Sequence, residues 1–185
     1  KHKIHSEFSQ VWDPEKVDML VIRENTEGLY HSLLRRSALR AQGKEMPEVN
    51  GMTFDGIEGE VAWDVRPISK NGTAKLIRLG FEYARRRGGS PHDSVSSVTC
   101  VDKSNVTRGC QLFRRVFHEI GEEYLDIKRD EAYIDAFTMW MVRNPEWFDV
   151  VVTSNMFGDI LTDLGSVLQG GMGMASSANI GDNHA

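Results

Sequence analysis

The fold follows from one stretch, Phe148-Asp-Val-Val-Val-Thr-Ser-Asn-Met-Phe-Gly-Asp-Ile-Leu-Thr-Asp-Leu164. Residues 148–153 are dominated by β-branched valines without polar alternation, which is typical of a strand covered on both faces. Ser154 or Asn155 can cap a helix that follows. An apolar stripe at helical spacing then continues through Phe157, Ile160, Leu161, Leu164, Val167 and Leu168. The stretch predicts a buried strand that runs directly into an amphipathic helix.

Two carboxylates lie on this predicted helix, four residues apart. Asp159 and Asp163 therefore stack on one face and repel each other, and the helix contains no lysine or arginine. A hard cation bound by oxygen ligands would relieve the repulsion. Alternatively, Asp159 complements the positive N-terminus of the helix and Asp163 lies on a solvated face. The helix taken alone favours this second interpretation.

The composition is that of an ordinary globular protein of 185 residues, with 40% hydrophobic and 26% charged residues. A net charge of −5 argues against a nucleic-acid surface, and no apolar run is long enough to span a membrane. The two cysteines, Cys100 and Cys110, are too few for a disulfide framework. These features predict a cytoplasmic protein.

Strands and helices alternate along the chain, which predicts the α/β class. Strands are expected at 17–22, 94–101 and 148–153, and helices at about 71–87, 107–122, 131–142 and 155–168. Residues 1–16 read as an irregular lead-in, and residues 170–181 as a loop of small residues. Between 31 and 59 the chain is polar and hard to assign, and the segments 51–54 and 59–66 could pair as a two-stranded arm.

The predicted helix at 131–142 has almost no polar face, so it should be buried all round. Asp135 is the charged residue inside it. An unpaired buried carboxylate costs several kcal/mol, so Asp135 must be protonated, salt-bridged or bound to a metal. With Asp159 and Asp163 it would form a site for Mg²⁺ or Mn²⁺.

Three further side chains lie where predicted strands end or turn. Arg23 follows an apolar strand and has the fork geometry for a carboxylate, although it could also pair with a neighbouring glutamate. Lys103 follows a buried strand, where burial can produce a neutral base, although a lysine pointing into water is commoner. Tyr30 follows Gly28 in a turn and is either a proton donor or a packing residue.

Five segments carry a family resemblance when they are taken together and in order. They are Arg23-Glu-Asn-Thr-Glu-Gly-Leu-Tyr30, Asp102-Lys-Ser-Asn-Val106, Tyr133-Ile-Asp135, residues 148–163 and Ser177-Ala-Asn-Ile-Gly-Asp182. They resemble the isocitrate/isopropylmalate dehydrogenase family of metal-dependent β-decarboxylating dehydrogenases. The resemblance implies an isopropylmalate dehydrogenase-like fold, with a central dimerisation and substrate domain at 17–169. It also implies a β-arm at about 31–69 and the start of a return to a cofactor domain at 170–185, so the chain reads as a piece of a longer protein.

The resemblance implies a role for each candidate residue. Arg23 is similar to the arginine that grips the malate carboxylates, Tyr30 to the acid that protonates the enol, and Lys103 to the base at the 2-hydroxyl. The metal carboxylates would be Asp135, Asp159 and Asp163. The positions near the dinucleotide, NAD or NADP, would be Asn105, Ser177 and Asn179.

The implied activity is oxidative decarboxylation of a 3-substituted malate of the isocitrate, homoisocitrate or isopropylmalate class. A tartrate- or malate-type enzyme is an alternative, as is a non-catalytic regulatory or dimerisation subunit of the same fold. A non-catalytic subunit would lose site residues, and those that can be checked are all present. In this family the lysine and the first aspartate reach into the neighbouring subunit's site. Lys103 and Asp135 therefore predict a homodimer with shared active sites, and the chain by itself is expected to be inactive.

Overall fold

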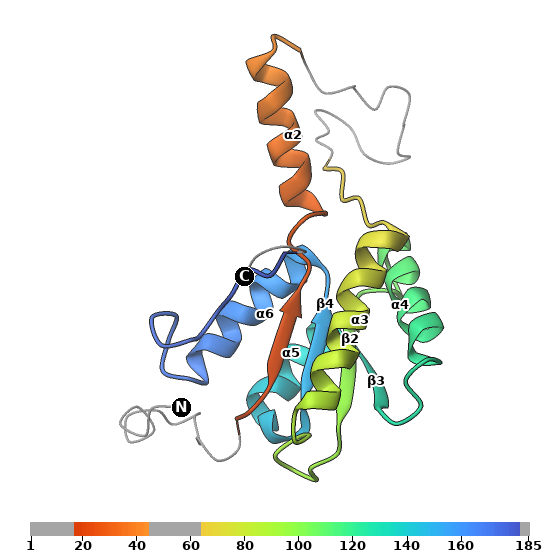
Figure 1. Ribbon diagram of the computed structural model, residues 1–185. Coiled ribbons are helices and arrows are strands. Elements are labelled where there is room, and N and C mark those ends of the chain that lie inside the picture. The colour runs from red at the N-terminus through yellow and green to blue at the C-terminus, as the bar shows by residue number, and fades with distance from the viewer. Residues whose placement is uncertain (1–16, 45–63, 182–185) are drawn as a thin grey trace, which may run out of the picture.

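A four-stranded, all-parallel sheet forms the centre of the computed structural model, which describes residues 17–44 and 64–181 (Figure 1). The strands are β1 (Leu20–Arg23), β2 (Ser97–Asp102), β3 (Lys128–Tyr133) and β4 (Val150–Thr153), and their order is β1-β4-β2-β3. The helices are α2 (Leu29–Ala41), α3 (Lys70–Arg86), α4 (Arg108–Gly121), α5 (Ile134–Arg143), the 3₁₀ turn η1 (Pro145–Trp147) and α6 (Asn155–Val167). The predicted α/β class is confirmed.

The two central strands, β2 and β4, are buried along their whole length because helices cover both faces of the sheet. Successive residues of a strand point to opposite faces. Val150 and Val152 pack with α3 and α4, whereas Val151 packs with α5 and α6. Figure 1 shows α3 and α4 on one side of the strands and α6 on the other. This two-sided cover explains why the sequence of β4 shows no polar alternation.

The prediction of a single helix over 131–142 is wrong at its start. Residues 128–133 form β3, which pairs in parallel with β2 from Ser97↔Lys128 to Asp102↔Tyr133, and α5 begins only at Ile134. The prediction of all-round burial is also wrong for the single chain. Met139 is 54% exposed and Trp140 is 40% exposed.

The region assigned to the β-arm begins with a helix instead. Helix α2 occupies Leu29–Ala41 and extends away from the sheet in Figure 1. Its sequence is rich in leucine, arginine and alanine, which are good helix formers, and the first glycine comes only at Gly43. Residues 51–54 and most of 59–66 lie outside the described residues, as does the lead-in at 1–16. The pairing of the arm therefore stays a prediction.

Both cysteines are buried and free. Burial raises the pKa of the Cys100 thiol well above its usual range, so this sulfur is a packing group and not a nucleophile. Within residues 17–44 and 64–181, no helix is both long and apolar enough to cross a membrane.

Arg87 anchors the end of α3 to the base of the sheet. Its Nε donates to Asp149 Oδ1 at 2.6 Å, and its Nη2 donates to the Asp18 carbonyl at 2.5 Å. The Asp149 side chain is fully buried, so removing its partner leaves an uncompensated charge in the core. We expect Arg87→Met to lower the free energy of unfolding by about 3 kcal/mol, measured by urea denaturation.

Arg85→Met is the matched control for this prediction. Arg85 ends the same helix and makes a two-pronged contact with Asp126, but both side chains are exposed. Exposed pairs contribute little to stability, so this variant should unfold close to the wild type. Equal effects of the two substitutions would show that the Asp149 contact is not a buried anchor.

Candidate active site

The candidate site lies where the parallel strands end. In an open α/β sheet the carboxyl ends of the strands form the ligand-binding edge. Arg23 is the last residue of β1, and Lys103 comes directly after β2. Helix α6 starts two residues after β4 and brings Asp159 to the same edge. Tyr30 is the second residue of α2, which follows β1.

Arg23, Tyr30 and Asp159 form one hydrogen-bonded cluster. Arg23 Nη1 contacts Asp159 Oδ1 at 2.5 Å, and Tyr30 Oη donates to the other carboxylate oxygen, Oδ2, at 2.8 Å. The guanidinium carbon of Arg23 also lies 5.4 Å from the centre of the Tyr30 ring. The partner of Asp159 is thus a cation from a distant strand, which a search within the helix could not find. Two residues predicted for substrate chemistry and one predicted for metal binding are brought together.

The protonation properties of Tyr30 and Asp159 are coupled. The hydrogen bond to the Asp159 carboxylate raises the pKa of Tyr30, because ionising the phenol would remove the donor and place two anions side by side. The same hydrogen bond, with the charge of Arg23, lowers the pKa of Asp159. The cluster therefore holds a protonated phenol beside an ionised carboxylate. A protonated phenol can donate a proton, and an ionised carboxylate can bind a cation.

Asn155 belongs to the same hydrogen-bonded cluster, although the sequence predicted it only as a possible cap. It is 2% exposed, and its side-chain oxygen accepts from Arg23 Nε at 3.2 Å and from Nη2 at 2.8 Å. Its amide nitrogen donates to the Glu27 carbonyl at 2.8 Å. The cap residue is Ser154, whose hydroxyl makes no capping bond and is buried without a partner in the described structure. Asn155 instead orients the guanidinium.

Two glycines allow this close packing. A Cβ on Gly158 would lie 2.5 Å from Arg23 Cγ, so only glycine lets the arginine cross the first turn of α6. Gly28 has φ of +88°, a conformation that side chains rarely adopt, and a Cβ there would lie 3.2 Å from Asn155 Cβ. Both glycines are needed at the junction of β1, α2 and α6.

The loop between Arg23 and Tyr30 is held by its own glutamates. Glu24 accepts from the backbone nitrogens of Thr26 at 2.6 Å and Glu27 at 2.8 Å. Glu27 in turn accepts from the backbone nitrogen of Ser69, at the start of α3, at 2.7 Å. The glutamates are therefore occupied with the backbone and not with Arg23, so the alternative of an Arg23–glutamate pair is not the one observed.

Lys103 and Asp135 form a separate pair. Lys103 Nζ contacts Asp135 Oδ1 at 2.6 Å, and this contact lowers the pKa of Asp135. The Asp135 side chain is 67% exposed, so the prediction that it is buried is wrong for the single chain. The reason is that α5 buries only Phe137 and Met141. Asp135 was expected to be protonated, salt-bridged or bound to a metal, and the structure shows the salt bridge.

The predicted metal ligands are not gathered within one chain. The described residues contain no group of three or more His, Cys, Asp or Glu side chains that could hold a metal ion. Asp159 and Asp163 lie on one helix, and Asp163 is exposed. Two carboxylates at this spacing suit a hard cation but leave most of its six or more oxygen ligands to come from elsewhere. The carboxylate oxygens suit Mg²⁺ or Mn²⁺ but supply only part of a site.

The predicted dinucleotide residues lie on exposed loops. Asn105 is in the turn after β2, and Ser177 is in the loop after α6. Asn179 Oδ1 accepts from Asn25 Nδ2 at 3.1 Å, so this loop returns to the segment that follows β1. The bond places Asn179 beside the Arg23–Tyr30 loop, whereas Asn105 and Ser177 make no contact that tests their roles.

Comparison with known proteins supports one family. The family model described as isocitrate/isopropylmalate dehydrogenase matches residues 3–185. A 3-isopropylmalate/3-methylmalate dehydrogenase of Methanocaldococcus jannaschii is 39% identical over 169 residues, which are 91% of this chain and 44% of that protein. A homoisocitrate dehydrogenase of the same organism is 39% identical over 172 residues, covering 92% and 42% of the two chains.

A solved structure agrees with the sequence comparisons. The isocitrate dehydrogenase from Methylococcus capsulatus superposes with a TM-score of 0.71 at 36% identity, over 91% of this chain and 43% of that one. The chain thus spans less than half the length of these relatives. The family model matches nearly the whole chain, and the parallel sheet presents Arg23, Tyr30 and Asp159 at its carboxyl edge. The chain therefore belongs to the isocitrate/isopropylmalate dehydrogenase family.

Proposed function

We propose that the chain is the central part of an enzyme that oxidises and decarboxylates a 3-substituted malate, with hydride transfer to NAD or NADP. Isocitrate, homoisocitrate and 3-isopropylmalate are the substrate classes that the names of the relatives support. The observation that carries the proposal is the Arg23–Tyr30–Asp159 cluster. In this cluster the Arg23 guanidinium and the Tyr30 phenol both contact the Asp159 carboxylate, which supports a site for an anionic substrate and a cation.

The chain's own residues can perform the two halves of the reaction. Arg23, oriented by Asn155, binds a substrate carboxylate through its fork. Lys103 removes the proton of the 2-hydroxyl while hydride leaves C2, which gives the 2-oxo acid. Loss of CO₂ from the β-carboxylate then leaves an enolate, whose oxygen takes back the proton held by Lys103. Tyr30 donates a proton to the carbon of the resulting enol while the oxygen proton returns to Lys103, which leaves the 2-oxo product. The phenol donates a hydrogen bond to Asp159, which raises the pKa of Tyr30.

Asp159 and Asp163 would hold the divalent ion, Mg²⁺ or Mn²⁺. The chemistry that such an ion supplies is Lewis-acid polarisation of substrate oxygens. Asp159 is already ionised for this role because its pKa is lowered. Asn105, Ser177 and Asn179 are proposed to contact the dinucleotide, which lies at the same edge of the sheet in this proposal. The free cysteines suit a cytoplasmic enzyme.

The active enzyme is proposed to be a homodimer. Helices α5 and α6 pack on each other and leave apolar side chains such as Met139, Trp140, Ile160 and Val167 exposed. A second copy would cover them by forming a four-helix bundle across a two-fold axis. The dimer would also carry Lys103 and Asp135 into the neighbouring site, where Asp135 would complete the carboxylate set. This accounts for their separation from Asp159 within one chain.

We expect Met139→Lys to convert the dimer into monomer or unfolded chain, because a charge would enter a core-like interface. Sedimentation equilibrium at micromolar concentration measures the outcome. Leu125→Lys is the control, since Leu125 is also highly exposed but precedes β3, away from α5 and α6. A folded, monodisperse wild-type monomer would refute the bundle and the shared site.

The proposed activity is tested by a panel of hydroxy acids. The full-length protein would be mixed with isocitrate, homoisocitrate, 3-isopropylmalate, tartrate or malate, with NAD or NADP and Mg²⁺ or Mn²⁺. Formation of the reduced nicotinamide is followed by absorbance. Turnover of at least one 3-substituted malate is expected. Turnover confined to tartrate or malate would redirect the substrate assignment, and a folded dimer that oxidises none of the panel would favour the non-catalytic alternative.

A further inference from the structure

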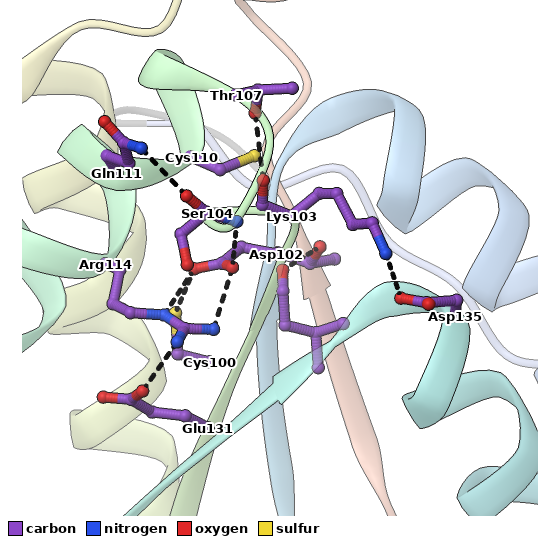
Figure 2. A network of polar contacts seen from close by, with 12 residues as sticks. Cys100, Asp102, Lys103, Ser104, Thr107, Cys110, Gln111, Arg114, Glu131 and Asp135 are labelled. Atoms are coloured by element: carbon purple, nitrogen blue, oxygen red, sulfur yellow. Dashed lines mark hydrogen bonds and ion pairs between the residues drawn. The ribbon is translucent and has the colours of Figure 1, made fainter.

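A second polar network lies beside Lys103, on the side of β2 away from Asp135 (Figure 2). Its centre is Asp102, the last residue of β2, which is 1% exposed. Arg114 of α4 grips both carboxylate oxygens, with Nε donating to Oδ2 and Nη2 to Oδ1, each at 2.9 Å. Arg114 Nη1 also contacts Glu131 Oε2 of β3 at 2.9 Å. One guanidinium thus joins α4, β2 and β3, and none of its contacts is used in the proposed reaction.

The network fixes the backbone on both sides of Lys103. Asp102 Oδ1 accepts from the backbone nitrogen of Ser104 at 2.8 Å, immediately after the lysine. The Lys103 carbonyl accepts from the backbone nitrogens of Val106 and Thr107, each at 3.0 Å. Because its backbone is closed into this turn, the direction of the Lys103 Cα–Cβ bond is fixed.

The side chains of Asp102 and Lys103 point to opposite sides of β2, as neighbours along a strand do. Figure 2 shows Asp102 turned towards Arg114 and Lys103 reaching towards Asp135. A ring links the two sides, because the Arg114 guanidinium lies 5.0 Å from the centre of Tyr133 and Lys103 Nζ lies 5.7 Å from it. The direction of the lysine is therefore coupled to Arg114 through Asp102 and through Tyr133.

We propose that Arg114 is a positioning residue that aims Lys103 at the 2-hydroxyl of the substrate. The effect on catalysis rests on the proposed function, whereas the effect of Arg114 on the position of Lys103 does not. The role requires arginine, because only a planar fork can hold both oxygens of Asp102 and still reach Glu131. A lysine at 114 would keep a cation beside the buried Asp102 but lose the geometry.

The catalytic test compares Arg114→Lys with Arg115→Lys in the full-length protein. Arg115 is the next residue of the same helix, and among the described residues its ion pair is an exposed one with Glu119, so its variant should behave as the wild type. We expect Arg114→Lys to lower kcat for hydroxy-acid oxidation about 10- to 100-fold, the scale of an ångström-sized misplacement. KM should change less than about threefold, because Arg23 still binds the carboxylate.

A purely structural role would damage both halves of the reaction together. Supplied with the 2-oxo acid intermediate, Arg114→Lys should decarboxylate it at close to the wild-type rate, because that step uses the Arg23–Tyr30–Asp159 cluster. Parallel loss of both steps, or unchanged oxidation, would overturn the inference. If Arg114→Lys does not fold, Tyr133→Leu removes the connecting ring and leaves the Asp102–Arg114 pair in place. It should show the same selective loss.

A spectroscopic readout separates this inference from the proposed function. In protein labelled with ¹³Cε-lysine, the Lys103 signal, assigned by Lys103→Arg, should carry a ring-current shift from Tyr133. Arg114→Lys should collapse that shift and Arg115→Lys should not. If the wild type oxidises none of the hydroxy acids, the proposed function fails, and the shift alone decides whether Arg114 positions Lys103. An unchanged shift in folded Arg114→Lys would contradict the positioning role.

Discussion

Asp159→Asn is expected to lower the turnover of the full-length enzyme about a thousandfold while leaving the fold intact, a loss on the scale that metal polarisation supplies. The neutral amide is a poor ligand for Mg²⁺ or Mn²⁺, which prefer charged oxygens. It also removes the charge that pairs with Arg23 and that accepts the hydrogen bond from Tyr30. Steady-state turnover and Mn²⁺ binding followed by paramagnetic resonance measure the two consequences.

The control for this variant is Asp126→Asn, which removes an exposed carboxylate between α4 and β3 that pairs with Arg85. It should bind Mn²⁺ and turn over as the wild type does. Removing the divalent ion with excess chelator should abolish activity in the wild type. Full activity in chelator would show that Asp159 does not serve a metal.

Substituting the two proposed proton-transfer residues, Lys103 and Tyr30, should impair different steps of the reaction. Lys103→Ala is expected to lower hydroxy-acid oxidation about a thousandfold, within the range for loss of a general base. Tyr30→Phe keeps the ring over Arg23 but loses the proton that the enol requires. It should therefore damage mainly the step after decarboxylation, by a similar factor. Supplying the 2-oxo acid intermediate distinguishes the two variants.

The expected pattern is that Lys103→Ala processes the 2-oxo acid normally, whereas Tyr30→Phe accumulates an enol that reprotonates from solvent. When the reaction is run in D₂O, the configuration at the new carbon–deuterium bond reports on this, because protonation from free solvent would be random. If the defect of the lysine variant were confined to protonating the enol, the two roles would have to be exchanged.

Local patterns in the sequence were enough to predict the central strands and the helices beside them. The valines of β4 predict burial on both faces, and the stripe from Phe157 to Leu168 predicts α6, because both signals come from residues close in the chain. Strand β3 was missed because Lys128–Tyr133 is an edge strand with charged residues and little apolar alternation. Its conformation is set by pairing with β2 and not by its own sequence.

Motifs in the sequence predict candidate site residues but not the partners of their side chains. Arg23, Tyr30 and Asp159 were chosen from motifs, yet the contact between Arg23 and Asp159 joins residues 136 positions apart. Asn155 could have been suspected, because it precedes Asp159 by one helical turn and so shares its face. Nothing in the local sequence links Asp102 to Arg114. For Asp135, the apolar neighbours suggested burial, whereas a single chain leaves that helix half uncovered.

The central claim is most directly tested by following both products of one turnover. A 3-substituted malate carrying deuterium at C2 and a labelled β-carboxylate would be given to the full-length protein with NAD or NADP and Mg²⁺ or Mn²⁺. The account predicts deuterium on the reduced nicotinamide and labelled CO₂ in equal amounts, and neither product in the presence of chelator. Reduced nicotinamide without CO₂, or both products in full amount without a divalent ion, would contradict it.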